Sequence, residues 1–122
     1  MEQRKEKRFA EQDEVIIKYV SSPKEAKAAE TIKATTLDIS LAGARILAKR
    51  SFSPGTILRV KVDLKKSGQV LNIDAEVKWC QQKADSETFE MGVEFLHNIS
   101  QTLLLLLKHL YMGRNGIPSE ID

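Results

Sequence analysis

The sequence holds little of several features on which common protein classes depend. Its single cysteine, Cys80, excludes a disulfide within the chain and a cysteine-rich metal site, and it favours a reducing compartment. The longest unbroken apolar run, Leu103 to Leu107, is much too short to span a bilayer. The N-terminus, MEQRKEKRFAEQDE, has no apolar stretch of the kind found in signal peptides. We therefore expect a cytoplasmic protein without membrane insertion.

The chain also has little net charge and few aromatic residues. A net charge of +2 argues against a dedicated duplex-DNA binder, which usually carries a clear basic excess. There are one Trp, two Tyr and four Phe, most at positions predicted to face a core, so few remain to stack on single-stranded bases. The 122 residues suit one compact domain.

Catalytic and metal-binding patterns are missing as well. His97 and His109 lie too far apart to form a helical ligand pair, and each is expected at the surface or boundary of the fold. We find no Ser–His–acid set on strand ends that would meet, no P-loop and no GxGxxG motif. Glu90 and Glu94 alternate outward on a strand and are interpreted as a solvated face. The sequence thus predicts no enzyme, no metal site and no cofactor site.

What the chain does have is alternation of apolar and polar residues with a period of two. This pattern predicts six strands: about 13–20, about 31–39, a third through Ala44, Ile46 and Ala48, then 58–64, 71–79 and 89–95. In the fifth strand the core-facing set is predicted to run from Leu71 through Val77 to Trp79. Six short strands with one apolar face each predict a closed barrel or a sandwich.

One helix is predicted after the strands, starting near Asn98 or Ser100. Its core-facing residues at i, i+3, i+4 and i+7 are Leu103, Leu106, Leu107 and Leu110. Three apolar residues lie off that face: Leu104, Leu105 and Met112. This surplus apolar surface is either a contact for another chain, including a second copy, or is covered by neighbouring loops.

The stretch TTLDISLAGARIL interrupts two strands with Asp38, Ser40 and Gly43. Taken alone, this set favours an ordinary turn, because Asp and Ser bond their own backbone and Gly adopts positive φ easily. Two arginines, Arg4 and Arg8, precede the first strand. If the first two strands pair antiparallel, residue 38 lies beside the start of the first strand. The arginines and the turn then share one end of the barrel, which favours a binding site.

These residues resemble the PilZ domain family. The family pattern RxxxR is matched by Arg4 and Arg8, and its [D/N]xSxxG pattern is matched by Asp38, Ser40 and Gly43, about thirty residues on. The later stretches VKW and MGVEF resemble closing strands of the family, and the resemblance covers about residues 3–112. It implies a mainly β fold, a six-stranded antiparallel PilZ-type barrel with a C-terminal α-helix.

The resemblance also implies a ligand, because PilZ domains are bacterial receptors for cyclic di-GMP. Guanidinium groups of Arg4 and Arg8 suit guanine edges and phosphates. The Asp38 carboxylate can accept from guanine N1–H and N2–H, the Ser40 hydroxyl can donate to a phosphate, and Gly43 leaves room for the ligand. Additional candidates are Gln3, Lys5 and Arg45.

The resulting expectation is a cyclic di-GMP receptor with a flexible ligand-binding segment at 1–12, the barrel and helix at 13–113, and a tail at 114–122. It would signal by a ligand-induced change in the N-terminal segment and in the surface shown to a protein partner. Two alternatives stay open: a barrel that binds single-stranded nucleic acid, and a degenerate PilZ module that binds only protein.

Overall fold

The computed structural model describes residues 7–19, 31–84, 86–97 and 100–113. Its strands are β1 (Phe9–Ala10), β2 (Glu14–Tyr19), β3 (Thr31–Ile39), β4 (Gly43–Ala48), β5 (Ile57–Leu64), β6 (Gln69–Gln82) and β7 (Phe89–Leu96). One α-helix, α1 (Ser100–Lys108), follows and continues into a π-helical turn, η1 (His109–Gly113).

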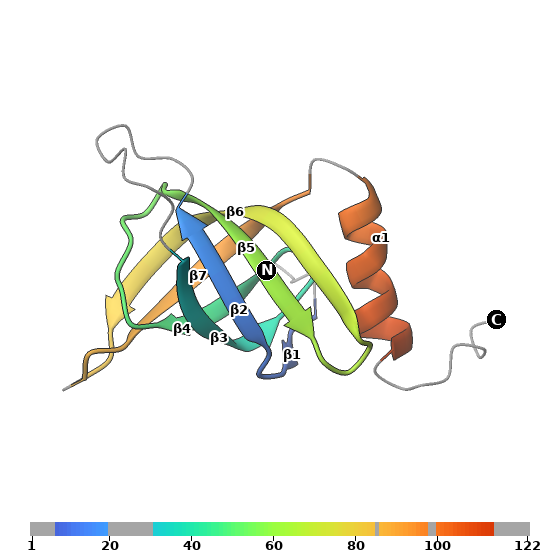
Figure 1. Cartoon of the computed structure of the whole chain (residues 1–122), viewed down its shortest axis with the longest axis horizontal. Helices are drawn as coiled ribbons and strands as arrows, with labels where there is room; N and C mark the ends of the chain where they lie inside the picture. Colours follow the sequence, from blue (N-terminus) through green and yellow to red (C-terminus); the bar gives the residue numbers. More distant parts are fainter. Residues whose placement is uncertain (1–6, 20–30, 85, 98–99, 114–122) are drawn as a thin grey trace, which may run out of the picture.

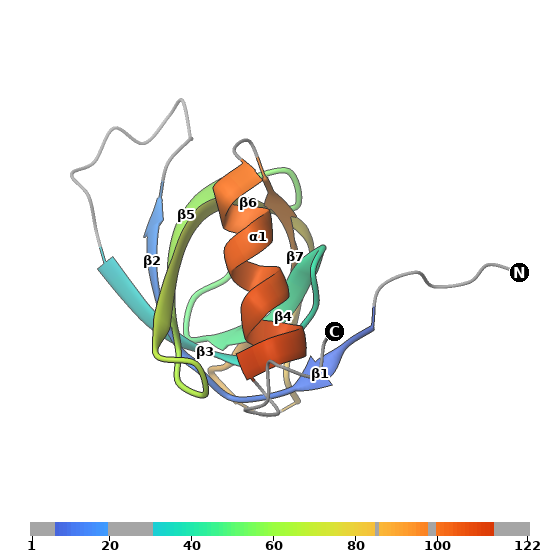
Figure 2. The ribbon, with the colours of Figure 1, turned by 90° about the vertical axis from the view of Figure 1, so that its right-hand side faces the viewer.

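Six of the strands close into an antiparallel barrel (Figure 1). The strand order is β3-β2-β5-β6-β7-β4, and pairing of β4 back onto β3 closes the ring. β1 is a short seventh strand that pairs with the end of β3, on the side away from β4. Figure 2 shows α1 lying across one end of the barrel. The mainly β, six-stranded architecture with a C-terminal helix, expected from the sequence, is thereby confirmed.

The barrel interior is filled by the alternating apolar residues. On β5, Leu58, Val60, Val62 and Leu64 are buried, while Arg59, Lys61 and Asp63 between them are exposed. The same alternation on the other strands supplies most of the core, because successive side chains of a strand point to opposite faces. The predicted break at Lys66–Gly68 is the β5–β6 hairpin, where Gly68 has a φ of 75°.

Pairing of the chain with the barrel begins at Phe9 and not at residue 13. Phe9 lies opposite Ile39 and Ala10 lies opposite Asp38. The connection to β2 is also bonded to β3, with the Glu11 amide donating to the Leu37 carbonyl at 3.2 Å. The expected flexible segment 1–12 therefore has its last residues in the sheet; residues 1–6 and the predicted tail 114–122 lie outside the described residues.

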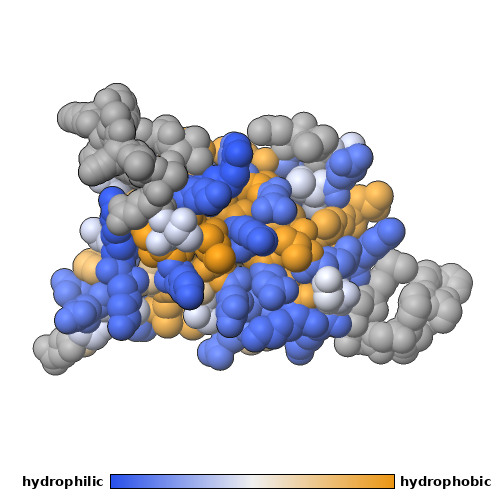
Figure 3. Space-filling view, viewed as in Figure 1, coloured by the Kyte–Doolittle hydropathy of each residue, from blue (hydrophilic) through white to orange (hydrophobic). Residues whose placement is uncertain are grey.

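The helix packs on the barrel through a different face from the predicted one. Leu106 and Leu110 are buried as expected, but Leu103 and Leu107 are exposed and Leu105 packs against the core. Apolar side chains consequently reach the surface along α1, at the right of Figure 3; they are Leu103, Leu104, Leu107 and, on η1, Tyr111. The prediction for Leu103 and Leu107 is wrong because the helix is rotated to bring Leu105 inward.

One histidine is placed differently from the expectation. His109 is completely buried, contrary to its expected position at the surface or boundary of the fold. His97 is half-buried and bonds Thr102 Oγ1 and the Leu41 carbonyl, which confirms its boundary position. Among the described residues, no helix is long and apolar enough to cross a membrane.

Candidate functional site

The strand pairing brings Arg8 to Asp38, thirty residues further along the chain. β2 and β3 pair antiparallel, with Glu14 opposite Thr35, so the end of β3 lies beside the residues that precede β2. There Arg8 Nη1 donates to Asp38 Oδ1 at 2.8 Å. Asp38 is largely buried, whereas the Arg8 side chain is 54% exposed and keeps most of its donors available to solvent or a ligand. The predicted approach of Arg8 to Asp38 is confirmed.

Asp38 also holds a second guanidinium group. Arg45 Nε donates to Asp38 Oδ2 at 2.8 Å, and Arg45 Nη1 donates to Glu90 Oε2 at 2.7 Å. Lys83 Nζ adds a 3.2 Å contact to the other oxygen of Glu90. The hydrogen bond from Arg45, followed by that from Lys83, keeps the pKa of Glu90 below its usual range despite burial. The interpretation of Glu90 as a solvated face is wrong, because these two cations cover it, while Glu94 is exposed.

The hydrogen bonds of the Ser40–Gly43 turn are those of an ordinary turn, as one of the two interpretations predicted. The Ser40 hydroxyl accepts from the amides of Ala42 and Gly43, at 3.2 Å each, and lies 3.3 Å from the Gly43 carbonyl. Gly43 does not need positive φ, which is confined among the described glycines to Gly55 and Gly68. A Cβ on Gly43 would instead lie 2.0 Å from the Val93 carbonyl oxygen. Gly43 is therefore required by the close approach of β7.

Two shifts in strand register change the direction of side chains at this end of the barrel. On β3, the register against β4 shifts between Thr36 and Asp38; on β6, the register against β7 shifts between Val77 and Trp79. Such bulges redirect the side chains that follow them. Trp79, predicted to face the core, is 38% exposed, and its ring lies over Gly92, where an added Cβ would be 2.3 Å from Nε1. The core prediction for Trp79 is wrong because alternation fails at the bulge.

A shallow pocket of about 320 Å³ lies between Arg8, the Gly43 turn and Trp79. Its lining includes Arg8, Gly43, Arg45, Lys78, Trp79 and Gly92. Three of these side chains are cationic, and the acidic groups beside them are paired: Asp38 with both arginines, Glu90 with Arg45, and Glu94, which also lines the pocket, with Lys78 Nζ at 3.2 Å. The pocket thus offers guanidinium and ammonium donors beside one exposed indole ring, a combination suited to an anionic aromatic ligand.

The predicted site residues fall into two groups. Arg8, Asp38, Ser40, Gly43 and Arg45 are gathered at this end of the barrel, and of these Arg8, Gly43 and Arg45 line the pocket. The remaining candidates, Gln3, Arg4 and Lys5, lie outside the described residues.

Several lining residues were not predicted as part of the site, among them Lys78, Trp79 and Gly92. The signal was present, since VKW and MGVEF had been singled out, but only as strands. Their part in the pocket follows from the β6 bulge, which the alternation does not show.

Comparison with solved structures gives the same fold. The PilZ domain of YcgR from Escherichia coli with c-di-GMP matches with a TM-score of 0.68 and 14% identity, covering 94% of both chains. The Bacillus subtilis inhibitor of motility, MotI/DgrA, matches with a TM-score of 0.69 and 21% identity, over 89% of this chain and 50% of that one. The K. pneumonia MrkH–c-di-GMP complex matches with a TM-score of 0.66 and 19% identity, over 95% and 56%.

This chain spans only about half of the MotI and MrkH chains. At these identities the likeness shows the fold alone, and no curated protein matches the sequence. The family model of the PilZ domain, however, matches residues 2–113, almost the whole chain. Together with the pairing of Arg8 with Asp38 at one end of a six-stranded barrel, this match shows that the chain belongs to the PilZ domain family.

Proposed function

We propose that this chain is a receptor that binds cyclic di-GMP in the pocket beside Asp38. It binds this ligand without converting it, and is not an enzyme. The observation that carries the proposal is the Asp38 carboxylate held between Arg8 and Arg45 at the edge of a cationic pocket. Membership of the PilZ family and the c-di-GMP complexes among its structural neighbours support the same ligand.

The chemistry of the pocket fits the two halves of such a ligand. Its two phosphodiesters carry two negative charges, which the guanidinium groups of Arg8 and Arg45 and, in the proposal, Arg4 receive. An ionised carboxylate has about four lone-pair sites, of which the arginines use two on Asp38, so guanine N–H groups can occupy the others. The exposed ring of Trp79 provides a flat surface on which a guanine stacks.

Ser40 and Gly43 contribute to this site mainly by shaping it. The Ser40 hydroxyl holds the turn through the amides of Ala42 and Gly43. The absence of a side chain on Gly43 lets β4 approach β7 and leaves the pocket open at that point.

The proposed signal runs from the N-terminal segment to the C-terminal helix. Arg8 immediately precedes β1, and Phe9 of β1 packs edge-on against Tyr111 at 5.5 Å between ring centroids. When the ligand draws Arg8 onto a phosphate, the position of Phe9 and hence of Tyr111 changes. Tyr111 is exposed beside the leucines of α1, so this apolar surface is the one that a protein partner, or a second copy of the chain, would recognise.

The two alternatives predict different surfaces. A single-stranded nucleic-acid barrel needs several aromatic platforms on a basic face, yet among the described pocket residues Trp79 is the one aromatic side chain. A module that binds only protein would need the leucines of α1 but not the pairing of Asp38 with Arg8 and Arg45.

Titration calorimetry with cyclic di-GMP, cyclic di-AMP and a short oligonucleotide separates these functions. We expect tight binding of cyclic di-GMP alone, with a change in fluorescence of Trp79, the single tryptophan. The Gly92→Ala variant tests the role of Trp79 in the same assay. The added Cβ must displace the indole ring and should therefore weaken stacking of the ligand. Binding of the oligonucleotide, or of neither dinucleotide, would contradict the proposal.

A further inference from the structure

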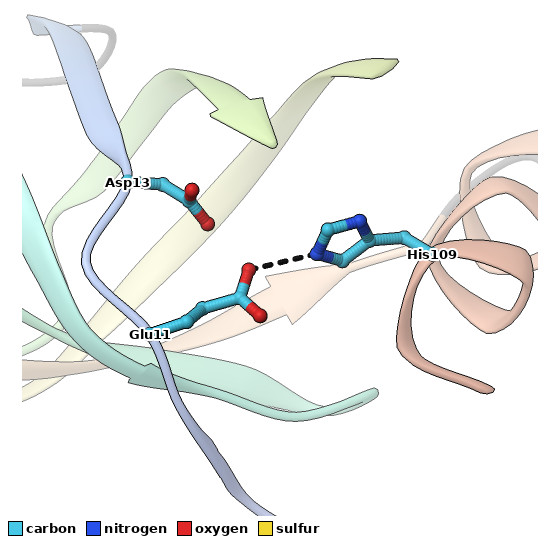
Figure 4. A group of neighbouring side chains, drawn as sticks. All are labelled: Glu11, Asp13 and His109. Carbon is cyan, nitrogen blue, oxygen red and sulfur yellow. Dashed lines mark hydrogen bonds and ion pairs between the residues drawn. The ribbon is translucent and has the colours of Figure 1, made fainter. Parts of the chain in front are cut away.

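A second polar cluster lies inside the fold and shares no residue with the pocket. Its members are Glu11 and Asp13, from the connection between β1 and β2, and His109 from η1, and all three are buried. Figure 4 shows their side chains pointing toward one another. One potential ligand atom from each, two carboxylate oxygens and an imidazole nitrogen, lies within 4.8 Å of the others. Three groups that can all act as acceptors thus converge on one buried point.

His109 is oriented as metal-bound histidines usually are. Its Nδ1 lies 2.6 Å from Ser67 Oγ, and its Nε2 lies 2.7 Å from Glu11 Oε2. When Nδ1–H donates to the serine hydroxyl, Nε2 presents its lone pair to the carboxylates. A polar partner on the second ring nitrogen is the common arrangement that fixes the tautomer of a metal ligand. At 2.7 Å, Nε2 and Glu11 Oε2 share a proton in a hydrogen bond, and a metal ion at this point would take the place of that proton.

Asp13 supplies the independent observation that a ligand is needed. Its Oδ1 accepts from the Lys65 amide at 3.1 Å, but its Oδ2 is buried and has no hydrogen-bond partner among the described residues. A buried, unsatisfied carboxylate oxygen is rare and costly. An ion bound at this point would give Asp13 Oδ2 its missing partner.

The backbone that carries both carboxylates is held firmly in place. Thr36 Oγ1 accepts from the Asp13 amide at 2.8 Å and donates to the Glu11 carbonyl at 2.6 Å. The Thr36 amide in turn donates to the Asp13 carbonyl at 3.0 Å. These bonds fix the connection against β3, so the two carboxylates are positioned before any ion arrives.

We propose that Glu11, Asp13 and His109 bind one divalent transition-metal ion, for which Zn²⁺ is the probe. One imidazole and two carboxylates form a mixed nitrogen and oxygen set, which suits Zn²⁺, Mn²⁺ or Fe²⁺ better than Ca²⁺, which prefers oxygen alone, or Cu⁺, which prefers sulfur. With metal–ligand bonds of about 2.0–2.1 Å, tetrahedral ligand atoms lie about 3.3 Å apart. A small opening of the Glu11–His109 contact admits the ion, and water completes its coordination.

The sequence prediction of no metal site considered only a helical pair of histidines and a cluster of cysteines. The proposed ligands instead come from both ends of the chain, with Glu11 and His109 98 positions apart. An ion at this point ties the residues that follow Arg8 and β1 to the π-helical turn after α1. Metal binding thereby stabilises the docking of the C-terminal helix on the barrel.

The test uses the full chain, freed of any affinity tag and of metal by a chelator. Calorimetry with ZnCl₂ should give one site per chain, and Tm should rise by about 10 °C at a free Zn²⁺ concentration of 100 times Kd. Asp13→Asn removes a ligand charge and should weaken Zn²⁺ binding by more than about tenfold, and Ser67→Ala, which removes only the orienting hydroxyl, by about tenfold. Asp63→Asn on β5, an exposed aspartate, is the matched control and should bind as the wild type does.

Two results would overturn the proposal: a wild-type Tm that Zn²⁺ leaves unchanged, or an equal shift in wild type and Asp13→Asn. The first would mean that protons alone occupy the cluster, and the second that the ion binds elsewhere. If Asp13→Asn does not fold, Co²⁺ bound to the wild type decides the question. Visible ligand-field bands of a four- or five-coordinate ion support the site, and the spectrum of the hydrated ion contradicts it.

Discussion

The role of Asp38 in selecting guanine gives the most specific prediction. In the free protein Asp38 accepts from Arg8 and Arg45 at 2.8 Å each. If its remaining lone pairs accept guanine N1–H and N2–H, each hydrogen bond to this charged group is worth about 1.5–3 kcal/mol. Because the carboxylate is shared with two guanidinium groups, we take about 2 kcal/mol in total, which corresponds to about 30-fold in Kd.

Asp38→Ala should therefore weaken binding of cyclic di-GMP about 30-fold, measured by calorimetry at fixed ionic strength. Cyclic di-AMP lacks those donors, and its weak binding should be unchanged or stronger, because the substitution removes one negative charge beside the pocket. Asp63→Ala makes the same change of charge at an exposed position on β5 and should alter neither affinity. An equal loss for both dinucleotides would show that Asp38 only supports the arginines, and no loss for cyclic di-GMP would show that Asp38 makes no contact with guanine.

Three further predictions concern stability and motion. Gly43→Ala places a Cβ 2.0 Å from the Val93 carbonyl oxygen, so it should cost about 2 kcal/mol or more and lower Tm by about 8 °C or more by calorimetry; an unchanged Tm would contradict the close approach. Glu90→Gln should lower the free energy of unfolding, measured in urea at neutral pH, by about 1 kcal/mol. Because the folded-state pKa of Glu90 is lowered, the difference between the two proteins should vanish as the pH falls through that pKa. A difference that persists in acid would contradict the ion pairs of Glu90. Amide exchange with saturating cyclic di-GMP should fall at residues 4–8 while β5 changes little; no change at residues 4–8 would refute the proposed N-terminal signal.

Much of the fold was predictable because alternation determines which face of a strand is buried. The buried residues of β5 followed from it. The supposed antiparallel pairing of β2 with β3, which the structure has, placed Asp38 beside Arg8. The same rule failed at the β6 bulge, where a shift in register turned Trp79 outward and onto Gly92. A bulge depends on the fit between neighbouring strands, which no local pattern encodes.

Two buried polar residues were unpredictable for a related reason. His109 is enclosed only because η1 returns to Glu11 and Ser67, which come from two other parts of the chain. Glu90 does point away from the barrel interior, as its position in the alternation indicated, but Arg45 and Lys83 cover it. In both cases tertiary contacts between distant segments determine burial, so sequence position alone was misleading.

The central claim is that the two motifs form a receptor site for cyclic di-GMP, and calorimetry of the arginine variants tests it most directly. We expect wild type to bind, and Arg4→Ala and Arg8→Ala each to weaken binding by at least about tenfold, as loss of a charge-assisted hydrogen bond implies. The Tm of free Arg8→Ala should hardly change, because its ion pair with Asp38 is largely solvent-exposed on the arginine side. No binding by wild type, or unchanged affinity in both variants, would contradict the claim.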